Sequence, residues 1–191
     1  MNKILSQRFA TSPRLELQHG DWLKQGMGAK TVKFDIGQGG LPPEVNWEDK
    51  AAAIGLIESR HAKALASLLV WGDNKLWDWS ESFDMVVNYL AARMIARCAE
   101  DKREAPRGGC YTLEELAKLV ARMTLHFELY DLWGLYTVEG RLLFSGINMN
   151  DRTYSNYFLC YQRHMLEDLE ELVRAIDGTV ESYRYQLNIC N

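Results

Sequence analysis

Residues 136–177 hold the strongest structural signal in this sequence, because a short helical segment, a glycine-containing turn and a long amphipathic segment follow one another there. Thr137 is a suitable cap for a helix over residues 138–145, and Gly146 can take the left-handed conformation that ends such a helix. This succession predicts a helix-turn-helix, and an ordinary helical hairpin would have the same outline.

The second segment, residues 151–177, is predicted to form one long helix capped by Asn150 or Asp151. Large side chains recur in it at spacings of three and four, which places them on one buried face. These side chains are Tyr154, Phe158, Tyr161 and Met165.

The opposite face of this predicted helix carries polar side chains that suit DNA. Arginine can bind guanine through two hydrogen bonds, asparagine can bind adenine, and both can bond phosphate oxygens. Any solvated amphipathic helix also has polar residues opposite its buried face, so the pattern leaves a purely structural helix open. The candidate DNA-binding residues on this face are Arg152, Thr153, Asn156 and Arg163.

Three more helices are predicted earlier in the chain, each from a capping signal followed by an apolar stripe of helical period. With the two helices after residue 136 they form a predicted all-α, bundle-like body of five helices. The first predicted helix lies between Asn46 and Gly72. The second begins at Asp78, in a capping box with Glu81, and ends at about Cys98, and the third begins at Thr112, in a capping box with Glu115, and ends before Gly134. The predicted core includes Leu65, Leu69, Phe83, Leu90, Leu116, Val120, Phe127, Phe158 and Leu169.

Two regions flank this body. Residues 1–46 contain several glycines and prolines and are predicted to form an extended arm, laid on the helical body or reaching away from it, which leaves residues 47–191 as the helical domain. From Gly178 onward, apolar residues alternate with polar ones, a period that predicts a short terminal strand or tail. The alternating residues are Tyr183, Tyr185 and Leu187.

Charge is unevenly distributed along the chain. Residues 1–34 hold six basic and two acidic residues, a net charge of +4, whereas the remainder holds 16 basic and 24 acidic residues, a net charge of −8. The basic arm could follow phosphates or an acidic protein surface, and it could equally be a solvated terminus. The net charge of −4 argues against a protein that coats nucleic acid without specificity. The candidate partner-binding residues of the arm are Arg8, Arg14, Lys24 and Lys30.

Three tryptophans lie close together between residues 69 and 79. Trp71 is predicted to belong to the core, because tryptophan is mostly buried. For Trp77 and Trp79 a place in the core and an exposed aromatic anchor for a protein partner are both open, and both residues are candidate partner-binding residues.

The sequence contains no pattern that indicates catalysis or a cofactor. The four cysteines are isolated, no histidine pair has metal-ligand spacing, and Gly37–Gly40 lacks the Lys-Ser/Thr that completes a phosphate-binding loop. No G-x-S-x-G motif and no Cys/His nucleophile context occurs. We therefore expect no enzyme, no metal, no cofactor and no small-molecule substrate.

Cellular location can also be predicted from the sequence. The sequence contains no run of about 18 apolar residues, so no membrane span is predicted. The first residues also lack the apolar core of a signal peptide. Unpaired cysteines fit a reducing compartment. These features predict a cytoplasmic protein with free thiols.

The sequence resembles the late antitermination (Q) proteins of lambdoid bacteriophages, specifically their zinc-free branch. Three segments carry the resemblance: HAKALASLLVWGDN (61–74), ELAKLVARMTLHFELYD (115–131) and the segment from Leu135 to Asp177. The stretch SPRLELQHGDWLKQGMGAK (12–30) adds to it. With the intervening helix, these segments cover a little over half of the chain.

The resemblance implies a largely helical, non-enzymatic protein of the bacterial host cytoplasm that binds a DNA element beside a late promoter. It would then load onto paused bacterial RNA polymerase and suppress pausing and termination in late gene expression. The family pattern would assign DNA reading to the four residues above, with support from Asn148 and Asn150.

Two other functions fit the same features. A dimeric helix-turn-helix repressor or activator would bind a palindromic operator with half-sites about 10 base pairs apart. A helical adaptor without a nucleic-acid role would have no affinity for specific DNA.

Overall fold

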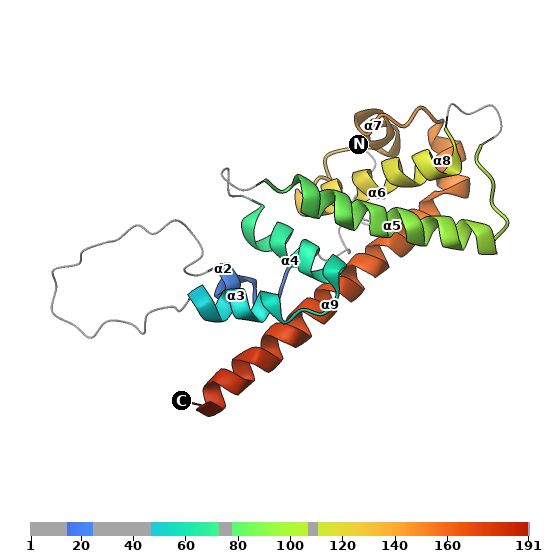
Figure 1. Cartoon of the computed structure of the whole chain (residues 1–191). Helices are drawn as coiled ribbons and strands as arrows, with labels where there is room; N and C mark the ends of the chain where they lie inside the picture. The colour runs from blue at the N-terminus through green and yellow to red at the C-terminus, as the bar shows by residue number, and fades with distance from the viewer. Residues whose placement is uncertain (1–14, 25–46, 73–77, 107–110, 191) are drawn as a thin grey trace.

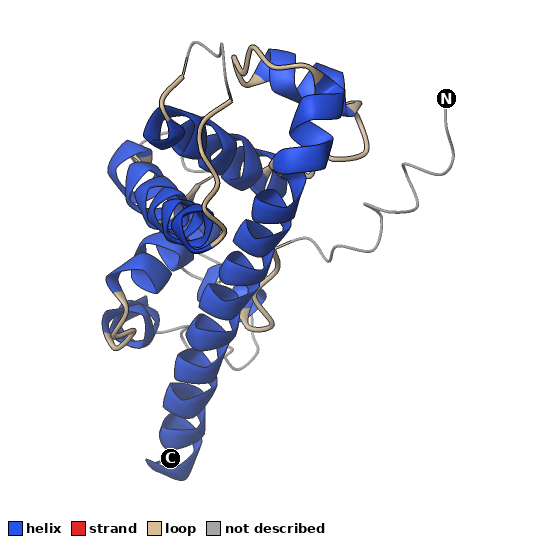
Figure 2. Cartoon of the chain, turned by 90° about the vertical axis from the view of Figure 1, so that its right-hand side faces the viewer, coloured by secondary structure: helices blue, strands red, loops and turns tan. Residues whose placement is uncertain are grey.

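The computed structural model describes residues 15–24, 47–72, 78–106 and 111–190. Within these ranges the chain forms helices and no strand, which confirms the predicted all-α fold (Figure 2). None of the helices described there is long and apolar enough to cross a bilayer. The helices are α2 (Gly20–Lys24), α3 (Trp47–Gly55), α4 (Arg60–Trp71), α5 (Ser80–Glu100), α6 (Leu113–Leu129), α7 (Val138–Phe144), α8 (Asp151–Tyr157) and α9 (Leu159–Cys190).

Helix α9 organises the molecule. It is 32 residues long, runs diagonally across the view, and packs against α3, α4, α5, α6 and α8 (Figure 1). Helices α5 and α6 lie side by side next to it. Asp168 of α9 is buried and accepts hydrogen bonds of 2.7 Å from Nη1 and Nη2 of Arg97, while Nη2 of Arg93 lies 2.7 Å from the same carboxylate. This cluster fixes α5 to α9.

The predicted core is confirmed. Eight of its nine residues are buried, and Leu69 is partly buried against them. Trp71, which was also predicted to lie in the core, is half-buried and packs against the same cluster. The apolar stripes therefore identify the inward faces of α4, α5, α6 and α9.

The first predicted helix is two helices rather than one. Ser59 accepts a hydrogen bond from the backbone N–H of Ala62 and caps α4, while Lys63 Nζ donates to the carbonyl of Gly55 at the end of α3. These local bonds satisfy both helix ends at the break. The helix α4 then ends at Gly72 as expected.

Of the predicted capping boxes, that of Thr112 and Glu115 is confirmed in both of its hydrogen bonds. The predicted box of Asp78 and Glu81 is wrong. Helix α5 begins at Ser80, and its N-cap residue is Trp79, which makes no side-chain cap. Asp78 accepts a hydrogen bond of 3.0 Å from the backbone N–H of Ser80. The predicted cap Asn46 lies outside the described residues.

The prediction of one helix over residues 151–177 is wrong at two points. The helical path is interrupted at Phe158, which separates α8 from α9. At the other end α9 continues through Gly178, so the predicted terminal strand is also wrong. Val180 is fully buried, and the hydroxyl of Tyr183 donates to Asp49 at 3.0 Å, which fixes this last part of α9 against α3.

The described part of the predicted arm, residues 15–24, packs on the body, which is one of the two arrangements that the sequence left open. Leu15 and Leu23 are buried, and α2 contacts α4. The backbone N–H of His19 donates to Asp177 at 3.5 Å, and Arg184 Nη1 lies 2.7 Å from the His19 ring. Lys24, a candidate partner-binding residue, is described and exposed, whereas Arg8, Arg14 and Lys30 lie outside the described residues.

Candidate nucleic-acid interface

Helix α7 begins at Val138 as predicted and ends at Phe144, one residue before the predicted end. The hydroxyl oxygen of Thr137 accepts a hydrogen bond of 3.1 Å from the backbone N–H of Gly140. Gly146 has φ = +71°, a conformation that side chains with a Cβ rarely adopt, and it ends the segment that was predicted to be helical. The chain is thus redirected between α7 and α8 by a turn that depends on glycine.

Tyr111, just before α6, forms two hydrogen bonds that stabilise this turn. The Tyr111 hydroxyl donates to the carbonyl of Gly146 at 2.7 Å and accepts from the backbone N–H of Asn148 at 2.9 Å. Because the two bonds fix both sides of the turn, they also orient the residues that lead into α8.

Helix α8 presents the candidate DNA-binding residues. Asn150 caps it by accepting a hydrogen bond of 2.9 Å from the backbone N–H of Arg152. Arg152 and Asn156 are exposed and lie one turn apart, whereas Thr153 between them is half-buried. The side chain of Asn148 in the turn is exposed as well.

Arg163 is exposed but belongs to α9. The interruption at Phe158 therefore places it on a different helix from Arg152 and Asn156, in contrast to the single predicted surface. The structure brings Asn148, Asn150, Arg152 and Asn156 together in the turn and α8, and Arg163 follows on the next helix.

A basic corner that the sequence did not predict lies beside α8. The guanidinium of Arg103 sits 5.0 Å from the ring centre of Tyr157, and Lys102 next to it is exposed. The hydroxyl of Tyr161 donates to Asp101 at 2.7 Å, which holds the same corner against the start of α9. Burial raises the pKa of Tyr161 to about 12, so it stays protonated as this donor.

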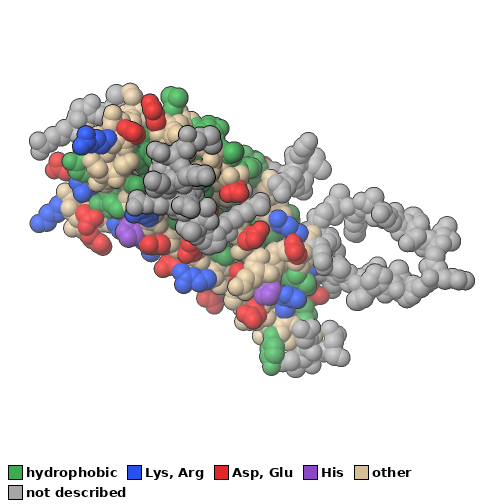
Figure 3. Space-filling view, turned by 180° about the vertical axis from the view of Figure 1, so that it is seen from behind, with side chains coloured by type: hydrophobic (Ala, Val, Ile, Leu, Met, Phe, Trp, Pro, Cys, Tyr) green, Lys and Arg blue, Asp and Glu red, His purple; other side chains and the backbone are tan. Residues whose placement is uncertain are grey.

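The charges around this corner are mixed. Asp101 and Asp151 are exposed beside the basic residues, and Figure 3 shows acidic and basic side chains interspersed over the face it presents. Any attraction to phosphate would therefore come from individual side chains and not from a broad positive field.

Buried polar groups beneath the candidate interface connect the helices that carry it. The Tyr154 hydroxyl donates to Gln162 at 2.9 Å across the interruption between α8 and α9, and burial raises the pKa of Tyr154 well above its usual range. Arg141 is buried, and its guanidinium lies 5.2 Å from the ring centre of Trp133. Trp133 Nε1 donates to the buried Glu128 at 2.7 Å. The first contact joins α8 to α9, and the other two join α7 to α6 through Trp133.

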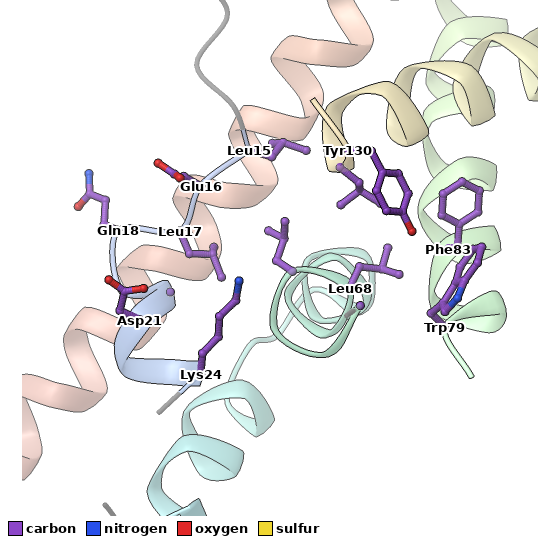
Figure 4. Close-up of a pocket in the computed structure, with 14 residues that line it drawn as sticks. Leu15, Glu16, Leu17, Gln18, Asp21, Lys24, Leu68, Trp79, Phe83 and Tyr130 are labelled. Carbon is purple, nitrogen blue, oxygen red and sulfur yellow. The ribbon is translucent and has the colours of Figure 1, made fainter. Parts of the chain in front are cut away.

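The candidate partner-binding residues lie elsewhere. Trp79 is exposed at the start of α5 and meets Phe83 edge to face at 5.3 Å. With Lys24 it lines a groove of about 560 Å³ between residues 15–24, the end of α4, and α5, shown in Figure 4. Trp77, Arg8, Arg14 and Lys30 fall outside the described residues.

Comparisons with known proteins add no identification. No family model, no curated protein and no solved structure matches this chain. The resemblance to antitermination proteins therefore rests on the sequence segments alone. Within the described ranges, no group of three or more His, Cys, Asp or Glu side chains is arranged to hold a metal ion.

Proposed function

We propose that this protein binds double-stranded DNA through a helix-turn-helix formed by α7 and α8 and acts in phage transcription. In that role it recognises a DNA element near a late promoter, loads onto paused bacterial RNA polymerase and suppresses pausing and termination. The polymerase part of the proposal rests on the resemblance to late antitermination proteins.

The observation that carries the DNA part is the exposed pair Arg152 and Asn156 directly after the braced turn. Both side chains project from the same side of a short helix whose other side buries Tyr154. Arginine and asparagine are suited to the edges of guanine and adenine, and fixed backbone geometry is what allows such side chains to read a sequence. Arg163 and Lys102, also exposed, would contact phosphates.

The first test measures DNA affinity. A cognate duplex would be selected from a random pool, and Arg152→Ala and Asn156→Ala should each weaken its binding by about 1 to 3 kcal/mol and relax preference at one or two base pairs. Arg163→Ala should weaken all duplexes alike and reduce the salt slope by about one. Arg174→Ala is the matched control, because Arg174 is an exposed arginine further along α9.

Run-off transcription with bacterial RNA polymerase, a late promoter and a downstream terminator tests the polymerase part. Arg152→Ala and Asn156→Ala should abolish read-through at the normal element. Fusion of the same variants to an unrelated DNA-binding domain whose site lies on the template should restore it. If the unfused variants bind DNA and antiterminate like the parent, α8 is only a structural helix.

A helical adaptor without a nucleic-acid role is the second candidate. The observation that favours it is the set of large apolar side chains exposed on and before α7. Failure to select any duplex at low salt would favour the adaptor, whereas selection of a palindrome with half-sites about 10 base pairs apart would indicate a dimeric repressor or activator.

A further inference from the structure

Large apolar side chains are concentrated on one part of the surface, between the end of α6 and the end of α7. Leu143 is 81% exposed and Leu135 is 73% exposed, and three aromatic residues near them are each more than a third exposed. We call this surface the aromatic patch. It consists of Tyr130, Leu135, Tyr136, Leu143 and Phe144.

The aromatic rings of the patch are in contact with one another. The rings of Tyr136 and Phe144 lie 5.6 Å apart, and His126 connects Phe144 at 5.6 Å with Tyr130 at 4.7 Å. The buried ring of Phe127 lies beneath them, 5.5 Å from Tyr136 and 5.6 Å from Phe144. The aromatic side chains of the patch are therefore packed against one another and against the core, and they are not isolated apolar side chains.

The segment that carries the patch, residues 129–146, has exposed charges of one sign, although the exposed Lys24 lines the groove that Tyr130 also lines. Between residues 129 and 146 the exposed charged residues are Asp131 and Glu139, since Arg141 is buried. Neither carboxylate forms a salt bridge with another described residue. Arg122, one turn before His126 on α6, is paired with Asp84 at 3.1 Å.

We propose that the aromatic patch binds an amphipathic helix of a partner protein, with an apolar face and Lys or Arg beside that face. The apolar face would cover the rings and the two leucines, and the basic residues would pair with Asp131 and Glu139. This inference does not depend on the DNA-binding proposal.

The same charges disfavour two other occupants. A second copy of the chain would meet the patch through a twofold axis, which brings the carboxylates of both copies toward one another. DNA phosphates would meet two carboxylates and no exposed cation within residues 129–146.

A synthetic helical peptide of Leu and Lys, about five turns long, is the probe, and a peptide with Glu in place of Lys is its counterpart. Fluorescence anisotropy should show that the full-length protein binds the Lys peptide. Leu143→Glu should weaken that binding at least about tenfold. Leu56→Glu is the matched control and should bind like the parent, because Leu56 is 56% exposed on the connection between α3 and α4, away from the patch. Circular dichroism checks that both variants are folded.

A second variant, Glu139→Lys, tests the role of charge. It should weaken binding of the Lys peptide and strengthen binding of the Glu peptide. Failure of the parent to bind the Lys peptide overturns the proposal. Equal losses in Leu143→Glu and Leu56→Glu, or equally tight binding of the Glu peptide, also overturn it. Sedimentation of the parent as a dimer that Leu143→Glu dissociates would assign the patch to a second copy instead.

Discussion

A single carboxyl group, that of Glu128, should make the stability of this protein depend on pH. Burial raises its pKa to about 7, a shift that the nearby Asp131 and Glu170 increase and the Trp133 hydrogen bond opposes. The folded state therefore binds a proton that the unfolded state releases near pH 4.5. This contribution to stability is complete below that pH and is lost as the pH rises toward 7.

Glu128→Gln tests this, because glutamine keeps a carbonyl oxygen for Trp133 but cannot ionise. At pH 8 the variant should be more stable than the parent by about 2 to 3 kcal/mol in urea unfolding, and at pH 4.5 the two should be nearly equal. Equal stabilities at both pH values would show that Glu128 is solvated in solution.

Two core phenylalanines provide a second test at this scale. Phe127 and Phe158 are almost completely buried, so truncation of either to Ala should lower the free energy of unfolding by about 3 to 5 kcal/mol. Tyr185→Ala is the control, because Tyr185 is 68% exposed on α9. Unchanged melting temperatures in both phenylalanine variants would contradict the assigned core.

Substitution of two glycines by alanine should change the stability of the protein in opposite directions. Gly178 lies inside α9 with open space around the position of a Cβ, so Gly178→Ala should stabilise the protein by about 0.5 to 1 kcal/mol. Gly146 has positive φ, so Gly146→Ala should destabilise it by about 1 kcal/mol even though space is also open there. Thermal unfolding measures both, and a destabilised Gly178→Ala variant would speak against a continuous α9.

The features that sequence predicted correctly depend on neighbours in the chain. Caps such as Thr112 and Thr137 act over three residues, and apolar stripes repeat every turn, so helix faces could be derived without a structure. The interruption at Phe158 could not, because Tyr154, Phe158 and Tyr161 keep a helical spacing across it. The break after α3 had a local signal in Ser59, which the apolar period on either side obscured.

The candidate interface was predictable only in part for the same reason. The exposed Arg152 and Asn156 follow from the period of α8, but the contacts that hold the turn and the basic corner do not. Tyr111 meets Gly146 from 35 residues away, and Arg103 meets Tyr157 from another element. Pairings between residues so far apart leave no periodic trace in a sequence.

At the scale of the whole molecule, the charge distribution limits how the protein can bind DNA. With a net charge of −4 and interspersed charges, it should neutralise few phosphates. Titration of a non-cognate duplex at increasing salt should give a shallow log–log slope of about −3. A slope steeper than about −6 would reveal a larger cationic surface than α8 and its neighbours supply.

The length of α9 also affects the order in which helices dock during protein synthesis. Segments from the two halves of the chain meet on it: His19 contacts Asp177 and Arg184, and Asp49 contacts Tyr183. A ribosome adds about 5 to 20 residues per second, and early segments ordinarily fold first. Here α2 and α3 can meet α4 early, but their contacts to α9 form only after residues 177–184 have been synthesised, so the docking of these two helices is completed late in translation.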